Sequence, residues 1–160
     1  MNDVMSILVV VVAFGAGYFL ISKLIDFSRN IAAKRPEMFG ERGTGEPEFL
    51  WNVCSMAKGV AMADGPLNSQ ELTAISDYIS RNTKGDTNLN VMLTKLVNDP
   101  AKLKVTVEKH AEQCHRLKGG YGGVLAGVFD FLEGVASSDG PINEAERGSL
   151  VRIRGGLRLG

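Results

Sequence analysis

The sequence is poor in the residues that mark several common protein classes. Of its 160 residues only two are cysteines, Cys54 and Cys114, so it has no disulfide framework. Both lie in segments with a helical pattern, where we expect them to be reduced and buried. Lysine plus arginine and aspartate plus glutamate balance at 18 each, so the chain has no overall basic field and nucleic acid is not an expected partner. No stretch alternates apolar and polar residues convincingly, which argues against strands.

Charge is also missing from one long stretch at the N-terminus. Residues 4–22, "VMSILVVVVAFGAGYFLIS", form an uncharged run of 19 residues. A helix that crosses a bilayer needs roughly 17–25 such residues. The run therefore predicts a single transmembrane helix that binds the lipid bilayer through residues 4–22.

Two other interpretations of this run are weaker. A cleaved signal peptide needs a positive segment before the apolar run, but "MND" contains no lysine or arginine, and no small-residue cleavage site follows. A buried core helix is seldom uncharged over this length. Basic residues follow the run, among them Lys23 and Arg29, and none precedes it, so the positive-inside rule predicts an inner-membrane protein with its N-terminus outside and its body in the cytoplasm.

The rest of the chain has an all-α pattern. We expect residues 1–35 to form the anchor and its basic juxtamembrane segment, 36–48 a linker rich in Gly, Pro and charge, and 49–160 a helical domain. Apolar residues recur at spacings of three and four in segments 48–63, 68–82, 88–99, 100–119, 124–138 and 143–157. Pro100 fits the first turn of its helix, with Asp99 as the cap. The glycine-rich "GGYGG" at 119–123 is expected to be a hinge.

The most informative feature is a repeated acidic turn. "GVAMADGPLNSQE" at 59–71 recurs as "GVASSDGPINEAE" at 134–146, with every matched residue 75 positions further on. Helix–turn–helix repeats with further helices between them are the expected architecture.

Divalent cation binding is one interpretation of this repeat. Counting Gly65 as position 6 of a calcium-binding EF-hand loop places Asp64 at position 5 and Glu71 at position 12, and the second copy places Asp139 and Glu146 likewise. Positions 1 and 3 hold valine, methionine or serine instead of acidic ligands. Because Ca²⁺ takes six to eight oxygens, neither loop can be an ordinary EF-hand.

Helix capping is the other interpretation, and it requires no metal. Asn68 with Glu71, and Asn143 with Glu146, have the spacing of a capping box, in which each side chain accepts a hydrogen bond from a backbone N–H at the helix start. The glycine of each turn suits a left-handed position that ends the preceding helix. This scheme leaves the two aspartates free.

The two turns, "AMADGPLNSQELTAI" and "ASSDGPINEAERGSL", resemble the paired turns of the TerB-like domain of tellurite-resistance and membrane-anchored DnaJ-like proteins. The resemblance covers Phe49 to the C-terminus. It implies two pseudo-symmetric helical repeats, a role in stress or metal response, and weak binding of a divalent cation, Ca²⁺ or Mg²⁺, by Asp64, Glu71, Asp139 and Glu146.

The resemblance leaves the function open between three classes. We expect a non-enzymatic interaction module with an unknown protein partner. A regulatory protein related to the co-chaperones is the alternative, but the His-Pro-Asp motif of a J domain does not occur. A metal-dependent enzyme is less favoured, because no motif supplies a catalytic base. His110 and Cys114 share a helix face as zinc ligands do, yet no second cluster completes four ligands.

Overall fold

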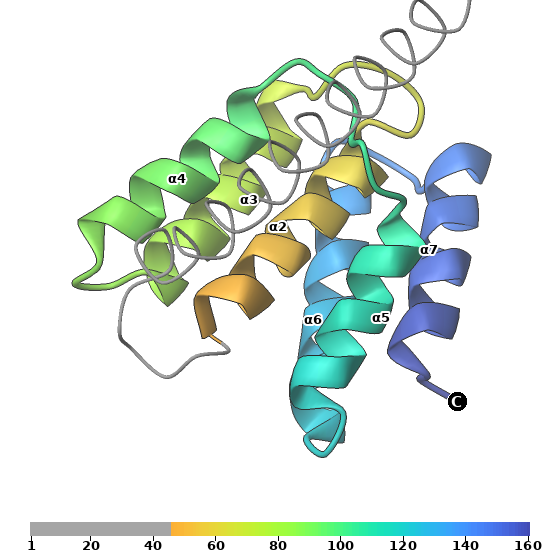
Figure 1. The fold of residues 1–160 in the computed structure, drawn as a ribbon. Helices are drawn as coiled ribbons and strands as arrows, with labels where there is room; N and C mark the ends of the chain where they lie inside the picture. The colour runs from red at the N-terminus through yellow and green to blue at the C-terminus, as the bar shows by residue number, and fades with distance from the viewer. Residues whose placement is uncertain (1–45) are drawn as a thin grey trace, which may run out of the picture. The chain divides into compact units, whose positions relative to one another are not determined.

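The computed structural model describes residues 46–160, and these residues belong to one compact unit. The described residues form six α-helices and no strand, so the all-α prediction is confirmed for this part of the chain. The helices are α2 (Glu46–Ala61), α3 (Ser69–Asn82), α4 (Thr87–Asn98), α5 (Val107–Lys118), α6 (Gly122–Ala136) and α7 (Glu144–Leu157) (Figure 1). The predicted membrane helix at 4–22, its basic segment and most of the linker lie outside the described residues.

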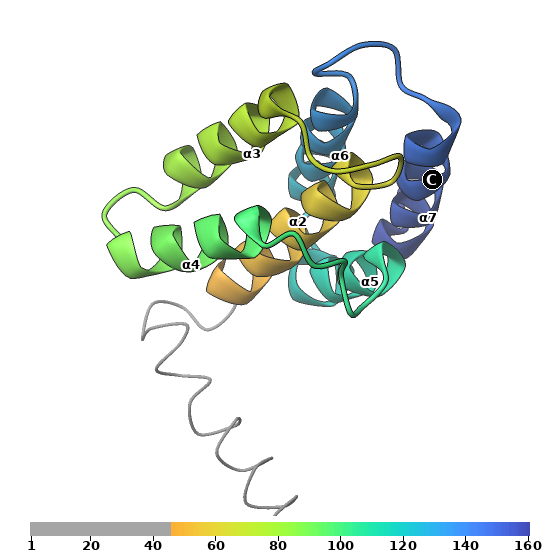
Figure 2. The ribbon, with the colours of Figure 1, turned by 90° about the horizontal axis from the view of Figure 1, so that it is seen from above.

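Helix α2 is the centre of the fold. It packs against each of the other five helices, with α3 and α4 on one side and α5, α6 and α7 on the other (Figure 2). The sequence predicts one apolar face, containing Val53, Met56 and Val60, but Cys54 and Ala57 are also fully buried. A helix surrounded by neighbours buries its whole circumference, which explains the difference.

The domain has its own hydrophobic core. All of the buried apolar side chains that form it lie between Phe49 and Leu157, and every helix contributes to it. Tyr78 of α3 stacks on Phe131 of α6, with ring centroids 4.0 Å apart, so the two predicted repeats also meet through aromatic packing. A complete core of this kind gives residues 46–160 the means to fold without the preceding segment.

Two local predictions are wrong. Helix α5 does not begin at Pro100: Thr106 is its N-cap, and the Asp99 side chain instead accepts a hydrogen bond from Ala101 N in an irregular connection. Residues 46–48, assigned to the linker, form the first turn of α2, where Pro47 needs no hydrogen-bond partner for its nitrogen.

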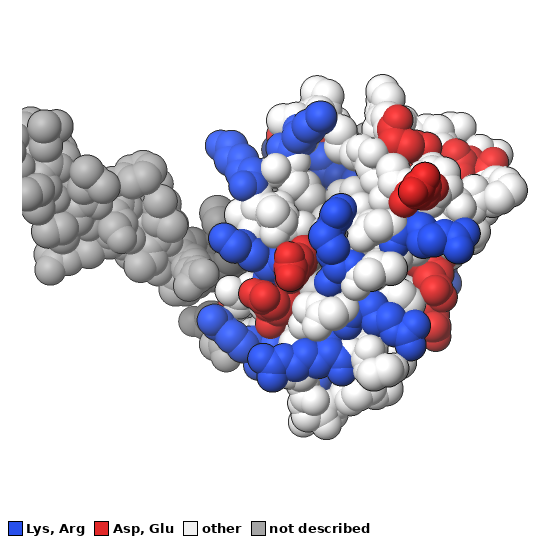
Figure 3. Space-filling view, turned by 90° about the vertical axis from the view of Figure 1, so that its right-hand side faces the viewer, with Lys and Arg blue, Asp and Glu red and all other residues white. Residues whose placement is uncertain are grey.

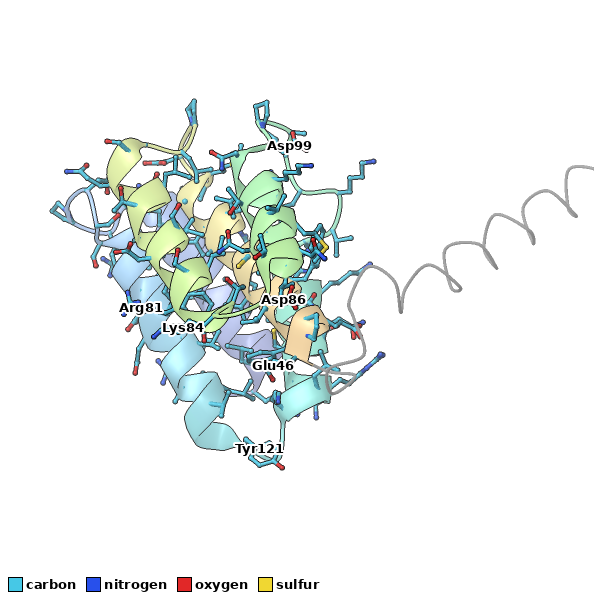
Figure 4. The ribbon with its side chains drawn as sticks, turned by 90° about the vertical axis from the view of Figure 1, so that its left-hand side faces the viewer. Glu46, Arg81, Lys84, Asp86, Asp99 and Tyr121 are labelled. Atoms are coloured by element: carbon cyan, nitrogen blue, oxygen red, sulfur yellow. The ribbon has the colours of Figure 1, made fainter. Side chains whose placement is uncertain are left out.

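Residues 119–121 of the glycine-rich segment connect α5 to α6, and the side chain of Tyr121 projects from this connection (Figure 4).

None of the helices in residues 46–160 is both long enough and apolar enough to cross a bilayer. The face of the domain seen in Figure 3 carries basic and acidic side chains interspersed.

Candidate functional site

Both copies of the acidic turn build a capping box. The Asn68 Oδ1 atom accepts hydrogen bonds from Gln70 N and Glu71 N at 2.9 and 3.0 Å, and Glu71 Oε2 accepts one from Asn68 N at 2.8 Å. In the second copy, Asn143 Oδ1 accepts from Glu146 N at 3.0 Å and Glu146 Oε2 accepts from Asn143 N at 2.9 Å. The capping prediction is therefore confirmed at the starts of α3 and α7.

The turn glycines do not act as predicted. Helices α2 and α6 end at Ala61 and Ala136, four residues before Gly65 and Gly140, so neither glycine closes a helix. Gly65 does not have a positive φ, and Gly140 has a φ of 159°, which is close to extended. Both glycines lie within the turn itself.

The two aspartates are not free, in contrast to the capping prediction. The Asn68 Nδ2 group donates to Asp139 Oδ2 at 2.7 Å, and the Asn143 Nδ2 group donates to Asp64 Oδ2 at 2.6 Å. Each asparagine therefore caps its own helix with its oxygen and binds the aspartate of the other turn with its nitrogen. We call these four residues, Asp64, Asn68, Asp139 and Asn143, the crossed clasp.

Three carboxylates converge beside the crossed clasp. One oxygen from each of Glu71, Asp139 and Glu146 lies within 4.8 Å of the others. Glu71 and Glu146 are each only 2% exposed, whereas Asp139 is exposed. We call these three residues the acidic triad. It includes three of the four predicted metal ligands and leaves out Asp64.

The acidic triad concentrates negative charge, and no residue between 46 and 160 forms an ion pair with it. Between Glu46 and Gly160 the only ion pair joins Lys118 to Glu46, at 3.0 Å, so no lysine, arginine or histidine of this region pairs with the triad. Burial raises the pKa of Glu71, and the nearby charges of Asp139, Glu146 and Asp64 raise it further, against the lowering effect of the hydrogen bond from Asn68 N.

The geometry suits a calcium ion. Two oxygens bound to one Ca²⁺ at about 2.3–2.6 Å from it lie at most about 5 Å apart, which the triad oxygens satisfy. Oxygens on one Mg²⁺ lie within about 4.2 Å of each other, so Mg²⁺ would fit only if all three oxygen separations fall below that value, whereas Ca²⁺ fits any separation up to 4.8 Å. The triad could therefore hold a divalent cation, with the remaining ligands supplied by water.

The alternative zinc interpretation has no support in this geometry. His110 Nδ1 lies 2.7 Å from Asn52 Oδ1, and Asn52 Nδ2 donates to Glu48 O, which orients the amide and makes His110 Nδ1 the donor. Cys114 is fully buried in the core, and burial raises the pKa of its thiol to about 12. His110 and Cys114 are thus part of the packing.

Sequence reasoning missed the connection between the turns. The sequence pattern predicts Asn68 and Asn143 only as helix caps, and the capping scheme gives Asp64 and Asp139 no structural role. The signal available was the repeated aspartate itself, which capping alone does not require.

Comparison of the chain with protein families, with curated proteins and with solved structures gives no match.

Proposed function

We propose that the chain is a non-enzymatic interaction module, resembling the TerB-like domain, whose two acidic turns are joined by a divalent cation. The observation that supports this most strongly is the acidic triad, in which carboxylates from both turns converge with no cationic partner in residues 46–160. Ca²⁺ is the first ion to test, because it fits every oxygen separation up to 4.8 Å, and Mg²⁺ is the alternative.

The energetic argument concerns the two buried glutamates. Burying a carboxylate costs free energy unless the charge is neutralised by a proton, a metal or a counter-ion. Each glutamate accepts one backbone hydrogen bond, which offsets part of this cost. A cation between Glu71, Asp139 and Glu146 would offset the remainder. Because three protein carboxylates supply few of the six to eight oxygens that Ca²⁺ takes, the expected dissociation constant is weak, about 10⁻⁴–10⁻³ M.

A cation at this position would act on the whole domain. Glu71 lies in the first turn of α3 and Glu146 in the first turn of α7, so the ion would tie the α2–α3 pair to the α6–α7 pair. The relative position of these pairs, and hence the surface offered to a partner protein, would then depend on the cation. This is regulation by binding, and it requires no catalytic group.

Thermal unfolding of residues 46–160 tests the cation. At a tenfold excess of Ca²⁺ over its dissociation constant, the folded state gains about 1.4 kcal/mol, or about 5 °C in Tm for a domain of this size. Asp139→Asn should abolish this shift while keeping an oxygen to accept from Asn68. Asp130→Asn, at an exposed position on α6, is the matched control and should leave the shift unchanged.

Three outcomes decide the cation proposal. A calcium-dependent shift that Asp139→Asn removes supports it. A shift of equal size in both variants would place the ion elsewhere, and no shift with Ca²⁺, Mg²⁺ or Mn²⁺ would leave capping and protonation as the whole explanation. Isothermal titration calorimetry on the same proteins gives the affinity directly.

Membrane attachment is the second part of the proposal, and it depends on the uncharged run at 4–22 followed by basic residues. In intact cells, added protease should leave the domain uncut; cleavage near Gly43 from outside would reverse the topology. A chain lacking residues 1–35 should stay in the supernatant after ultracentrifugation, and pelleting with membranes would indicate another attachment.

A further inference from the structure

A cavity of about 470 Å³ lies between α2, α4 and the irregular connection that follows α4, and it shares no lining residue with the acidic triad. Asp86 and Asp99 flank α4 in Figure 4, and the connection begins at Asp99. Apolar side chains supply much of the lining: Trp51, Met92, Leu96 and Leu103, each partly exposed. A volume of this size with a mainly apolar lining is typical of a small-molecule site.

A buried hydroxyl without a partner lines the same cavity. Ser55 is 1% exposed, and its Oγ atom makes no hydrogen bond to any residue between 46 and 160. Buried polar atoms are nearly always paired, and an unpaired one costs stability. An acceptor atom of a bound molecule would satisfy it.

One turn further along α2, a buried ammonium group faces the same region. Lys58 is 2% exposed, and its Nζ donates to the carbonyl oxygens of Leu96, at 3.0 Å, and Asp99, at 2.6 Å. An ammonium has three N–H donors, so one remains without a partner in the described part of the chain. Ser55 and Lys58 are three residues apart on α2 and therefore share one face of the helix.

The lining of the cavity is positively charged. Lys95, Lys102 and Lys104 are exposed residues of the lining, and together with Lys58 these four lysines face a single acidic residue of the lining, Asp99. The Asp99 carboxylate is engaged by Ala101 N at 2.8 Å. Long-range attraction from the lysines would favour an anion, and it would weaken as salt is added.

We propose that this cavity binds an anionic amphiphile, a molecule with one carboxylate or phosphate head on an unbranched apolar chain. The head accepts hydrogen bonds from Ser55 Oγ and Lys58 Nζ, and the chain lies against Trp51, Met92 and Leu103. The same chemistry occurs in a free fatty acid and in a bilayer lipid, and the experiment below separates these sources.

Trp51 provides the assay, because it is the only tryptophan in the chain and lines the cavity. Residues 46–160 are titrated with octanoate, decanoate and dodecanoate below their micellar concentrations, and tryptophan emission is recorded. Each added methylene should raise affinity about fourfold until the chain fills the cavity. Dodecanol, the uncharged counterpart, should bind at least tenfold more weakly than dodecanoate. Vesicles of phosphatidylglycerol, compared with phosphatidylcholine, test the lipid source by the same emission change.

Two variants test the assigned contacts. Ser55→Ala should weaken dodecanoate binding about tenfold while the ligand-free domain becomes no less stable, because the variant removes an unpaired polar atom. A purely structural serine would not separate affinity from stability in this way. Lys102→Gln with Lys104→Gln should also weaken binding and reduce its salt dependence, whereas Lys84→Gln with Lys109→Gln, outside the cavity lining, should not.

The outcomes are decisive for the cavity. Emission changes with dodecanoate that need about tenfold more ligand in Ser55→Ala support a free acid; changes only with phosphatidylglycerol vesicles, weakened in the same variant, support a lipid. Equal binding of dodecanol and dodecanoate, binding unaffected by Ser55→Ala, or no emission change with any probe would overturn the proposal.

Discussion

The side chain of Asn68 makes three hydrogen bonds with different partners, so substitutions at this one position can separate capping from clasping. Its oxygen caps α3, and its nitrogen binds Asp139 Oδ2 of the other turn. Serine keeps a capping oxygen but has no group that reaches Asp139 as the amide does. Alanine loses both functions. Aspartate keeps the cap but places a carboxylate against Asp139.

The magnitudes follow from these losses. Asn68→Ser should cost about 1 kcal/mol, the net value of a hydrogen bond, because exposure of this pair reduces the benefit of its charge. Asn68→Ala should cost about 2 kcal/mol, since it also removes a cap worth about 1 kcal/mol. Asn68→Asp should cost more than Asn68→Ser at pH 7, and the excess should shrink in acid, where the introduced carboxyl is protonated and can donate.

Asp86 supplies the matched control. It caps α4 through Leu89 N at 3.0 Å and makes no side-chain contact with the other turn. Asp86→Ala should therefore lower the free energy of unfolding by about 1 kcal/mol, and Asp86→Ser should leave it nearly unchanged. Urea unfolding of residues 46–160, followed by circular dichroism, measures all five variants. If Asn68→Ser proves as stable as the wild type and Asn68→Ala matches Asp86→Ala, the clasp contributes nothing and the reasoning fails.

Three further predictions concern other parts of the domain. Without a cation, the raised pKa of Glu71 means that the folded state holds its proton more tightly than the unfolded chain. The free energy of unfolding should thus be highest below the ordinary value of 4.5 and fall as pH rises through the folded pKa; urea melts from pH 4 to 8 should show this decline, and saturating Ca²⁺ should reduce it. Gly59→Ala should destabilise by about 1–2 kcal/mol, because its Cβ would overlap Val107 Cγ1, whereas the matched Gly134→Ala, with open space around it, should stabilise by about 0.5–1 kcal/mol; equal thermal shifts would contradict the packing argument. Burial raises the pKa of Cys54 and Cys114 to about 12, so at pH 8 both should react with a thiol reagent at least a thousandfold more slowly in the native domain than in urea, and comparable rates would refute it.

The helical pattern predicted most of the fold because apolar spacing directly reports which face of a helix is buried. Ile75 and Ile79 of α3, and Leu93 and Val97 of α4, are buried as their spacing predicts. The pattern could not identify α2 as the central helix. Small residues such as Ala57 are acceptable on exposed and buried helix faces alike, so only the packing of five neighbours distinguishes them.

In the candidate site, the sequence predicts contacts between residues that are close in the chain but not contacts between distant residues. The capping boxes are local, and the spacing of Asn68 and Glu71 was sufficient to predict one. The crossed clasp joins residues 71 and 79 positions apart, and no local pattern reports that separation. The sequence also did not predict the cavity between α2 and α4. Its buried residues Ser55 and Lys58 belong to α2, whose apolar pattern indicates only a core helix.

The crossed clasp also has a consequence for the order of folding. Each helix pair, α2 with α3 and α6 with α7, can associate locally, whereas the clasp requires both pairs to be in place. Contacts of such high sequence separation carry a large loop-closure cost and tend to form late. Substitutions in the clasp should therefore leave the refolding rate nearly unchanged and accelerate unfolding. The two hydrogen bonds would thus lengthen the lifetime of the folded domain, and a bound cation would extend that lifetime further without hastening the formation of the domain.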